Sequence, residues 1–147
     1  MLANHADAAR AEVISVLDRR LEAMQVKDID QAMSAYSPDI VYFDIIPPHQ
    51  FVGAVAVRRN FLRWFAEYRG DIKLETHDLS VAVSGDVAFA HMLHPDSGTR
   101  RSGQEVTVWV RSTVCLQRSS GRWLITHEHI SFPINPNDWS AVVDAAP

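Results

Sequence analysis

The chain has 147 residues, of which 47% are hydrophobic and 22% charged, and its formal net charge is −4 at pH 7. That length suits one domain, which we place at residues 1–147. The acidic balance, with no basic cluster beyond Arg100-Arg101, argues against nucleic acid or an anionic membrane as a partner. No apolar run is long enough to span a membrane, and the N-terminus lacks a signal-peptide pattern, so we expect a cytoplasmic protein. The single cysteine, Cys115, excludes an intrachain disulfide.

Two helices are predicted first. Residues 8–27 place apolar side chains at helical spacing, whereas most charged side chains lie off that stripe. The apolar set is Val13, Leu17, Leu21 and Met24, and the charged set is Arg10, Glu12, Arg19, Arg20 and Lys27. Asp28 is typical of an N-cap, with Gln31 three residues on, and indicates a short second helix.

A short strand and a third helix follow. Ser37-Pro38-Asp39 ends the second helix, and residues 40–44 form a strand with which residues 50–52 pair back. From 54 to 68 the helical spacing returns, with Val57, Phe61, Trp64 and Phe65 on one stripe, and Gly70 closes the helix. This aromatic stripe is typical of a core face, and a cavity lined by the same residues also fits it.

The rest of the chain is predicted as strands. They cover 71–84, 87–93, 105–117 and 121–133, with turns at 84–86 and 119–121 and a polar loop over 95–103. Helices first and long antiparallel strands afterwards predict an α+β fold with the helices on one face of the sheet. In the tail, 135–147, Trp139 indicates docking onto the domain.

The last strand carries three titratable groups side by side. His127 and His129 point to one face of this strand and Glu128 to the other, so a cavity, an interface or a buried polar network must accommodate at least one set. Counting outward from the 119–120 turn places Arg111 opposite Glu128 and predicts an ion pair, provided that no bulge intervenes. Two imidazoles alone do not make a metal site, and we expect no bound metal.

Two segments have the character of a known family. Residues 36–44 run from an aromatic at a helix end to Asp44, and residues 121–131 contain Gly121-Arg122-Trp123 followed by His127-Glu128-His129-Ile130-Ser131. The first resembles the ketosteroid isomerase segment that ends in the catalytic aspartate. The second resembles the terminal strand of the calcium/calmodulin-dependent protein kinase II association domain and of SnoaL-like proteins. The resemblance implies the nuclear transport factor 2-like (NTF2-like) fold, a cone of three N-terminal helices on a curved antiparallel sheet.

The resemblance implies that Asp44 is a general base, while turn capping at the strand end is an equally good interpretation of this residue. Tyr42 shares its face and would donate to a substrate oxygen or serve only as an aromatic lining residue. His94 falls where the association domain implies a pocket arginine. Ketosteroid isomerase also places a tyrosine from its first helix on the enolate oxygen, and here no tyrosine precedes Tyr36, so steroid isomerisation is not expected.

Two functions follow. One is a cofactor-independent isomerase, cyclase or dehydratase for a small hydrophobic molecule, acting as a homodimer, with no Gly-rich phosphate loop to hold a cofactor. Its predicted catalytic residues are Asp44 and His129, and its predicted substrate-binding residues are Tyr42, Phe61, Trp64, His94, Arg111, His127 and Glu128. The other is a non-catalytic ligand-binding or oligomerisation module similar to the kinase association domain.

Overall fold

The computed structural model describes residues 2–147, with side chains from residue 5 onward. It contains three helices, α1 (Leu2–Gln25), α2 (Ile29–Met33) and α3 (Ala54–Phe65). The Asp28 side chain caps α2 by accepting a hydrogen bond from the Gln31 amide at 3.2 Å, as predicted. Most side chains of the stripes predicted on α1 and α3 are buried, with Val13 and Val57 wholly inaccessible to solvent, while Leu21 and Trp64 are partly buried. None of the described helices is long and apolar enough to cross a membrane.

Seven strands form one sheet, in the order β2-β1-β7-β6-β5-β3, and β4 also pairs with β5. The strands are β1 (Tyr36–Phe43), β2 (Phe51–Val52), β3 (Tyr68–Leu74), β4 (His77–Ser84), β5 (Val87–Arg100), β6 (Glu105–Ser119) and β7 (Arg122–Ser131). Strand β1 runs parallel to β7, and every other pair is antiparallel. This is the predicted α+β class, with helices on one side of a mostly antiparallel sheet.

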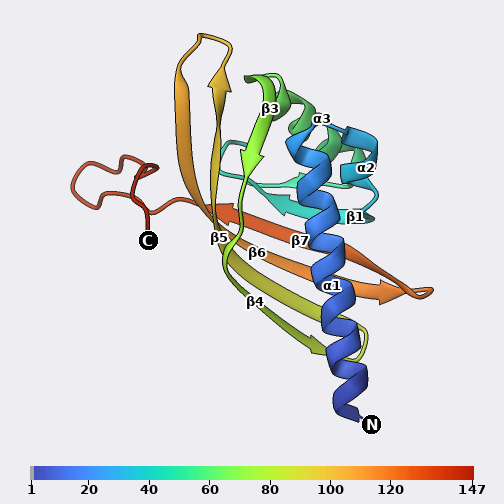
Figure 1. Cartoon of the computed structure of the whole chain (residues 1–147). Helices are drawn as coiled ribbons and strands as arrows, with labels where there is room; N and C mark the ends of the chain where they lie inside the picture. Colours follow the sequence, from blue (N-terminus) through green and yellow to red (C-terminus); the bar gives the residue numbers. More distant parts are fainter. Residues whose placement is uncertain (1) are drawn as a thin grey trace.

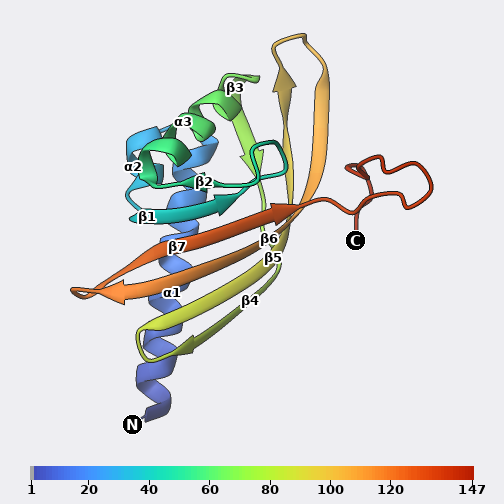
Figure 2. The same ribbon diagram turned by 180° about the vertical axis from the view of Figure 1, so that it is seen from behind.

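The sheet is curved, and the helices lie on its concave side. Figure 1 shows α1 crossing the sheet diagonally, with α2 and α3 gathered at the end where β3 stands. Seen from behind, the sheet forms one bent surface with the C-terminal tail projecting from its edge (Figure 2). Strand β5 joins the two ends, because its first part pairs with β4 and its last part with β3. The side chains between α1, α3 and the concave face form the core.

Several predicted boundaries were wrong. Strand β1 begins at Tyr36, because the segment after the expected helix break pairs with β7 through an irregularity between Tyr36 and Val41. Helix α3 ends at Phe65, and Gly70, expected to close it, lies inside β3 with a φ of +64°. Residues 71–84, expected as one strand, divide between β3 and β4. The expected polar loop over 95–103 is strand as far as Arg100, because β3 and β6 supply backbone partners that the local sequence does not reveal.

The register of the last hairpin differs from the prediction. Ser119 pairs with Arg122, and the ladder then shifts by one residue between Leu116 and Cys115. The turn is thus centred one residue later than expected, and the irregularity adds a further residue to β7. Glu128 therefore lies opposite Val114, and the predicted Arg111–Glu128 ion pair does not form.

The tail docks, but not through its tryptophan. The Trp109 amide donates to the Val143 carbonyl at 2.8 Å, and the Val142 amide to the Pro133 carbonyl at 2.8 Å. Trp139, expected to pack on the domain, has 79% of its surface exposed. The backbone of the tail, rather than its aromatic residue, holds the tail to the domain.

Candidate functional site

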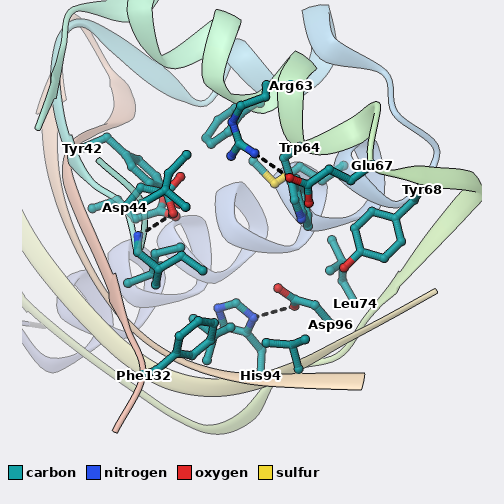
Figure 3. Close-up of a pocket in the computed structure, with 18 of the residues that line it drawn as sticks. Tyr42, Asp44, Arg63, Trp64, Glu67, Tyr68, Leu74, His94, Asp96 and Phe132 are labelled. Carbon is teal, nitrogen blue, oxygen red and sulfur yellow. Dashed lines mark hydrogen bonds and ion pairs between the residues drawn. The ribbon is translucent and has the colours of Figure 1, made fainter. Parts of the chain in front are cut away.

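A cavity of about 240 Å³ lies between the helices and the concave face of the sheet. Figure 3 shows His94 and Asp96 on the sheet side of this cavity, across from Arg63 and Trp64 of α3 and from Glu67 just after it. Most of the lining surface is apolar, although ionisable side chains also border the cavity. The apolar lining comes mainly from Leu21, Met24, Phe61, Trp64, Leu74, Val108, Val110 and Ile130. Such a cavity suits a hydrophobic small molecule with a few polar groups.

The deepest polar group of the cavity is a buried ion pair. Arg20 Nη1 lies 2.5 Å from Glu128 Oε1, and the Tyr36 hydroxyl donates to the same oxygen at 2.8 Å. The three residues are at most 6% exposed. Burial, the largest influence, works against the charged guanidinium, but the contributions of Glu128, Tyr36 and Tyr42 together outweigh it and the pKa of Arg20 is raised. Arg20 and Glu128 are therefore a fixed pair of opposite charges. With Tyr42 they form what we call the deep end of the cavity, because these three lining residues are at most 6% exposed.

Tyr42 stands beside this ion pair. Its ring is held edge-on against Phe61, with a centroid distance of 5.4 Å and an interplanar angle of 85°. Tyr42 is 4% exposed and lines the cavity. Burial, and next the charge of Glu128, raise the pKa of Tyr42 well above 10.0, so its phenol stays protonated.

Asp44 follows β1 directly and is half-buried at the cavity. The Asn60 side-chain amide donates to its Oδ2 at 2.5 Å, and the Ile45 backbone amide to its Oδ1 at 2.6 Å. Asn60 is itself buried on α3 and accepts a hydrogen bond from Arg63 Nε at 3.1 Å. The carboxylate is thus held in one orientation while it still borders the cavity, as a general base requires.

His94 and Asp96 form a second polar pair on β5. His94 Nδ1 lies 2.8 Å from Asp96 Oδ1, and the two side chains are 17% and 14% exposed. His94 and Asp96 are two positions apart on β5, with Pro95 between them, so their side chains point to the same face of the strand. Because Asp96 engages Nδ1, the Nε2 atom of His94 is left to exchange a proton with a bound molecule.

Charged residues of α3, of the turn after it and of β5 also line the cavity. Arg63 Nη1 lies 2.7 Å from Glu67 Oε1, with about two-fifths of each side chain exposed. The Arg100 guanidinium lies over the Tyr68 ring, 5.9 Å from its centroid. Exposed pairs of this kind contribute little to stability.

Three of the predicted site residues lie away from this cavity, on the outer face of the sheet. His127 Nδ1 is 2.7 Å from the Val41 carbonyl, and His127 and His129 both pack edge-on against Phe43. Arg111 donates to Ser131 and to the Phe132 carbonyl. None of the three lines the cavity. Tyr42, Asp44, Phe61, Trp64, His94 and Glu128 do come together there.

The sequence analysis missed three polar residues of the site. Arg20 was placed off the apolar stripe, yet it follows Leu17 by three positions and precedes Met24 by four, a spacing that turns it inward. Asn60 likewise precedes Trp64 of the predicted stripe by four positions, so the same spacing marks it. Asp96 lies in a segment that the sequence predicts as loop, so its strand alternation with His94 becomes visible only in β5.

Among the described residues, no three His, Cys, Asp or Glu side chains are grouped so as to hold a metal ion.

The comparison with protein families identifies this architecture. A family model described as a SnoaL-like domain matches residues 13–135. The chain belongs to the SnoaL-like domain family. The match covers α1 from residue 13 onward and all the later helices and strands, so the cavity of this SnoaL-like domain is formed by family elements, with the tail beyond residue 135 added.

Solved structures agree with this assignment. The SnoaL-like domain is 30% identical to an NTF2-like protein of unknown function from Pseudomonas putida KT2440, with a TM-score of 0.87 over 96% of this chain and 98% of that one. A putative dehydratase of the NTF2-like family from Streptomyces avermitilis is 20% identical, with a TM-score of 0.76 over 85% and 97% of the two chains. A putative calcium/calmodulin-dependent protein kinase II association domain from Xanthomonas campestris is 20% identical, with a TM-score of 0.72 over 82% and 84%. At these lower identities the likeness concerns the fold. No curated protein matches the sequence.

Proposed function

We propose that this SnoaL-like domain is a cofactor-independent enzyme that moves protons on a small hydrophobic molecule, in an isomerase, cyclase or dehydratase type of reaction. The observation that carries the proposal is that Asp44 and the His94–Asp96 pair border the same mostly apolar cavity. The similar fold of a putative dehydratase and of a ketosteroid isomerase-like protein supports it.

In this proposal Asp44 is the base. It removes a proton from a carbon next to a carbonyl group, whose oxygen takes up the electron pair as the enol forms, while the Asn60 amide and the Ile45 N–H keep the carboxylate in place. His94, oriented by Asp96, exchanges a proton with the substrate through Nε2. His129, predicted as the second catalytic residue, lies on the outer face and takes no part in this mechanism.

The size of the cavity limits the substrate. Clefts for drug-sized ligands have volumes of roughly 300–1,000 Å³. At about 240 Å³ this cavity lies below that range. We therefore infer a substrate of one or two rings, smaller than a steroid.

Proton exchange at carbon tests the proposal without knowledge of the natural substrate. The protein is incubated in D₂O with small cyclic ketones such as 1-indanone and 2-cyclohexenone, and deuterium uptake next to the carbonyl is followed by NMR. We expect the Asp44→Asn variant to lose catalysed exchange by about 10²- to 10⁴-fold, the usual contribution of a positioned base. His129→Asn, on the outer face, is the matched control and retains the full rate. Equal exchange in Asp44→Asn and the unaltered protein would remove Asp44 from the mechanism.

A second candidate is an assembly module. Val87 and Phe89 on the outer side of β5 are 53% and 51% exposed, and Phe89 lies in register with Cys115 of β6. Two proteins with similar folds are a putative and an identified association domain. In this candidate the outer face joins copies of the chain into an oligomer larger than the homodimer expected of the enzyme. Light scattering on the unaltered protein and on Phe89→Glu tests this: a higher oligomer that the variant dissociates supports it, and a monomer or a plain dimer contradicts it.

A further inference from the structure

The Tyr42 hydroxyl is a hydrogen-bond donor without a partner among the residues whose side chains the structure describes. Among the described residues, Arg20 Nε and Ser112 Oγ are the fully buried side-chain polar atoms that lack a hydrogen bond. The Tyr42 hydroxyl is not one of these atoms, so it is not sealed in the core. Its residue nevertheless is 96% buried, since only 4% of its surface is exposed, and it lines the cavity. The hydroxyl therefore faces the cavity.

The neighbouring acceptor is already engaged. Glu128 Oε1 accepts from both Arg20 at 2.5 Å and Tyr36 at 2.8 Å. Tyr36 and Tyr42 both pack against Phe61, with centroid distances of 5.4 Å, so Phe61 holds both rings in place. Buried polar groups of this kind are rarely left unpaired, because an unmade hydrogen bond costs about 1–3 kcal/mol. Tyr42 is thus prepared for an acceptor that comes from a ligand.

The charges around Tyr42 select the kind of acceptor. Burial first, and then the negative charges of Glu128 and Asp44, raise the pKa of Tyr42 and keep its phenol protonated, whereas Arg20 lowers that pKa by less than any of these. The one cation at this end, Arg20, is already paired with Glu128. A ligand carboxylate placed here would meet negative charge without a free cation to balance it. A neutral oxygen has no such cost.

We propose that the deep end of the cavity is a binding subsite for a neutral carbonyl or hydroxyl oxygen of a one- or two-ring molecule, held by the Tyr42 hydroxyl, and that it rejects carboxylates. The subsite depends on the proposed function in one respect only, namely that the substrate binds in this cavity. Binding at Tyr42 requires no turnover, so the two ideas are tested by different measurements on the same ligand.

Three matched probes test the subsite: 1-indanone, indane, which lacks the oxygen, and indane-1-carboxylate. Their dissociation constants are measured by ligand-observed NMR. We expect 1-indanone to bind roughly fivefold more tightly than indane, the value of one net hydrogen bond, and the carboxylate to bind at least about tenfold more weakly than the ketone. In Tyr42→Phe the preference for the ketone over indane disappears. Tyr68→Phe, a cavity tyrosine that lies beside Arg100 rather than Glu128, keeps it.

A second measurement does not depend on the variant folding. The ¹³C carbonyl resonance of bound 1-indanone moves downfield from its position in cyclohexane if the oxygen accepts a hydrogen bond. An unmoved resonance, equal binding of ketone and indane, tightest binding of the carboxylate, or no binding of any probe overturns the subsite. A Tyr42-dependent ketone preference without deuterium exchange removes the proposed function and keeps the subsite. Exchange without that preference removes the subsite alone.

Discussion

The two faces of β7 carry similar side chains in different surroundings. Glu128 points inward, is 5% exposed and is locked to Arg20, whereas His127 and His129, its neighbours in sequence, lie on the outer face beside Phe43. Only the inner face borders the cavity. Strand alternation therefore separates the titratable residues of β7 into two sets, and the helices packed on one face decide which set is buried.

The largest expected difference between the two faces is in stability. Glu128→Ala leaves the buried Arg20 without its partner, so we expect a loss of about 3–5 kcal/mol in the free energy of unfolding. His129→Ala, one residue on, should change it by about 0.5 kcal/mol or less, as for a surface substitution. Urea denaturation measures both.

A double variant sharpens this result. Arg20→Met with Glu128→Leu removes both charges and should recover most of the stability lost in Glu128→Ala, since an uncompensated charge is the main cost. If the single variant unfolds no more easily than His129→Ala, the buried ion pair is not a determinant of the fold.

The next expected effect concerns the orientation of His94. Asp96→Asn removes the carboxylate that holds Nδ1 at 2.8 Å, and we expect deuterium exchange of 1-indanone to slow by about 10²-fold, the usual cost of misplacing a catalytic group. His91→Asn, on the outer side of the same strand, is the control and should react at the full rate. Equal rates in the two variants would contradict a role for the His94–Asp96 pair.

The three tyrosines give a pH test of the inner face. Tyr36, Tyr42 and Tyr68 are the only tyrosines, and burial raises the pKa of each above the ordinary value of 10.0. Their contribution to stability is therefore complete below pH 10 and is lost as the pH rises above it, where the unfolded chain ionises first. We expect phenolate absorbance at 295 nm to stay flat through pH 10 in the folded protein, and to rise near pH 10 in urea. A folded-state rise near pH 10 would place at least one phenol in water.

The smallest expected effect comes from the tail. Val143 lines the cavity but lies beyond the family match at residue 135. Val143→Ala removes part of an apolar contact and should weaken 1-indanone binding about threefold, as the loss of roughly one buried methylene equivalent predicts. Val87→Ala on the outer face should leave that dissociation constant unchanged. A Val143→Ala protein that binds the ketone as tightly as the unaltered chain would exclude the tail from the site.

The sequence predicted the helices and strands better than the contacts between them. Periodicity identified the buried stripes of α1 and α3, and the Asp28 cap and the hairpin turns also followed from local chemistry. The position of Asp44 at the end of β1 placed it at the cavity. The spacing of Arg20 from Leu17 and Met24 indicates its burial, but its pairing with Glu128 depends on a contact across 108 positions, which no local pattern encodes.

The sequence also left undetermined which face of the last strand, β7, points into the domain. Alternation separated Glu128 from His127 and His129, but only the packing of α1 fixes Glu128 as the inward residue. The Arg111–Glu128 prediction failed because the turn is centred one residue later than expected and an irregularity in the ladder then shifts every later pair by one more residue.

The central claim, that chemistry belongs to the inner face, is tested most directly by the imidazole resonances of the protein. In protein labelled with ¹⁵N-histidine, titration with 1-indanone should shift the side-chain signals of His94 and leave those of His127 and His129 in place. Shifts at His127 or His129 with His94 unmoved would place the ligand on the outer face and contradict the account.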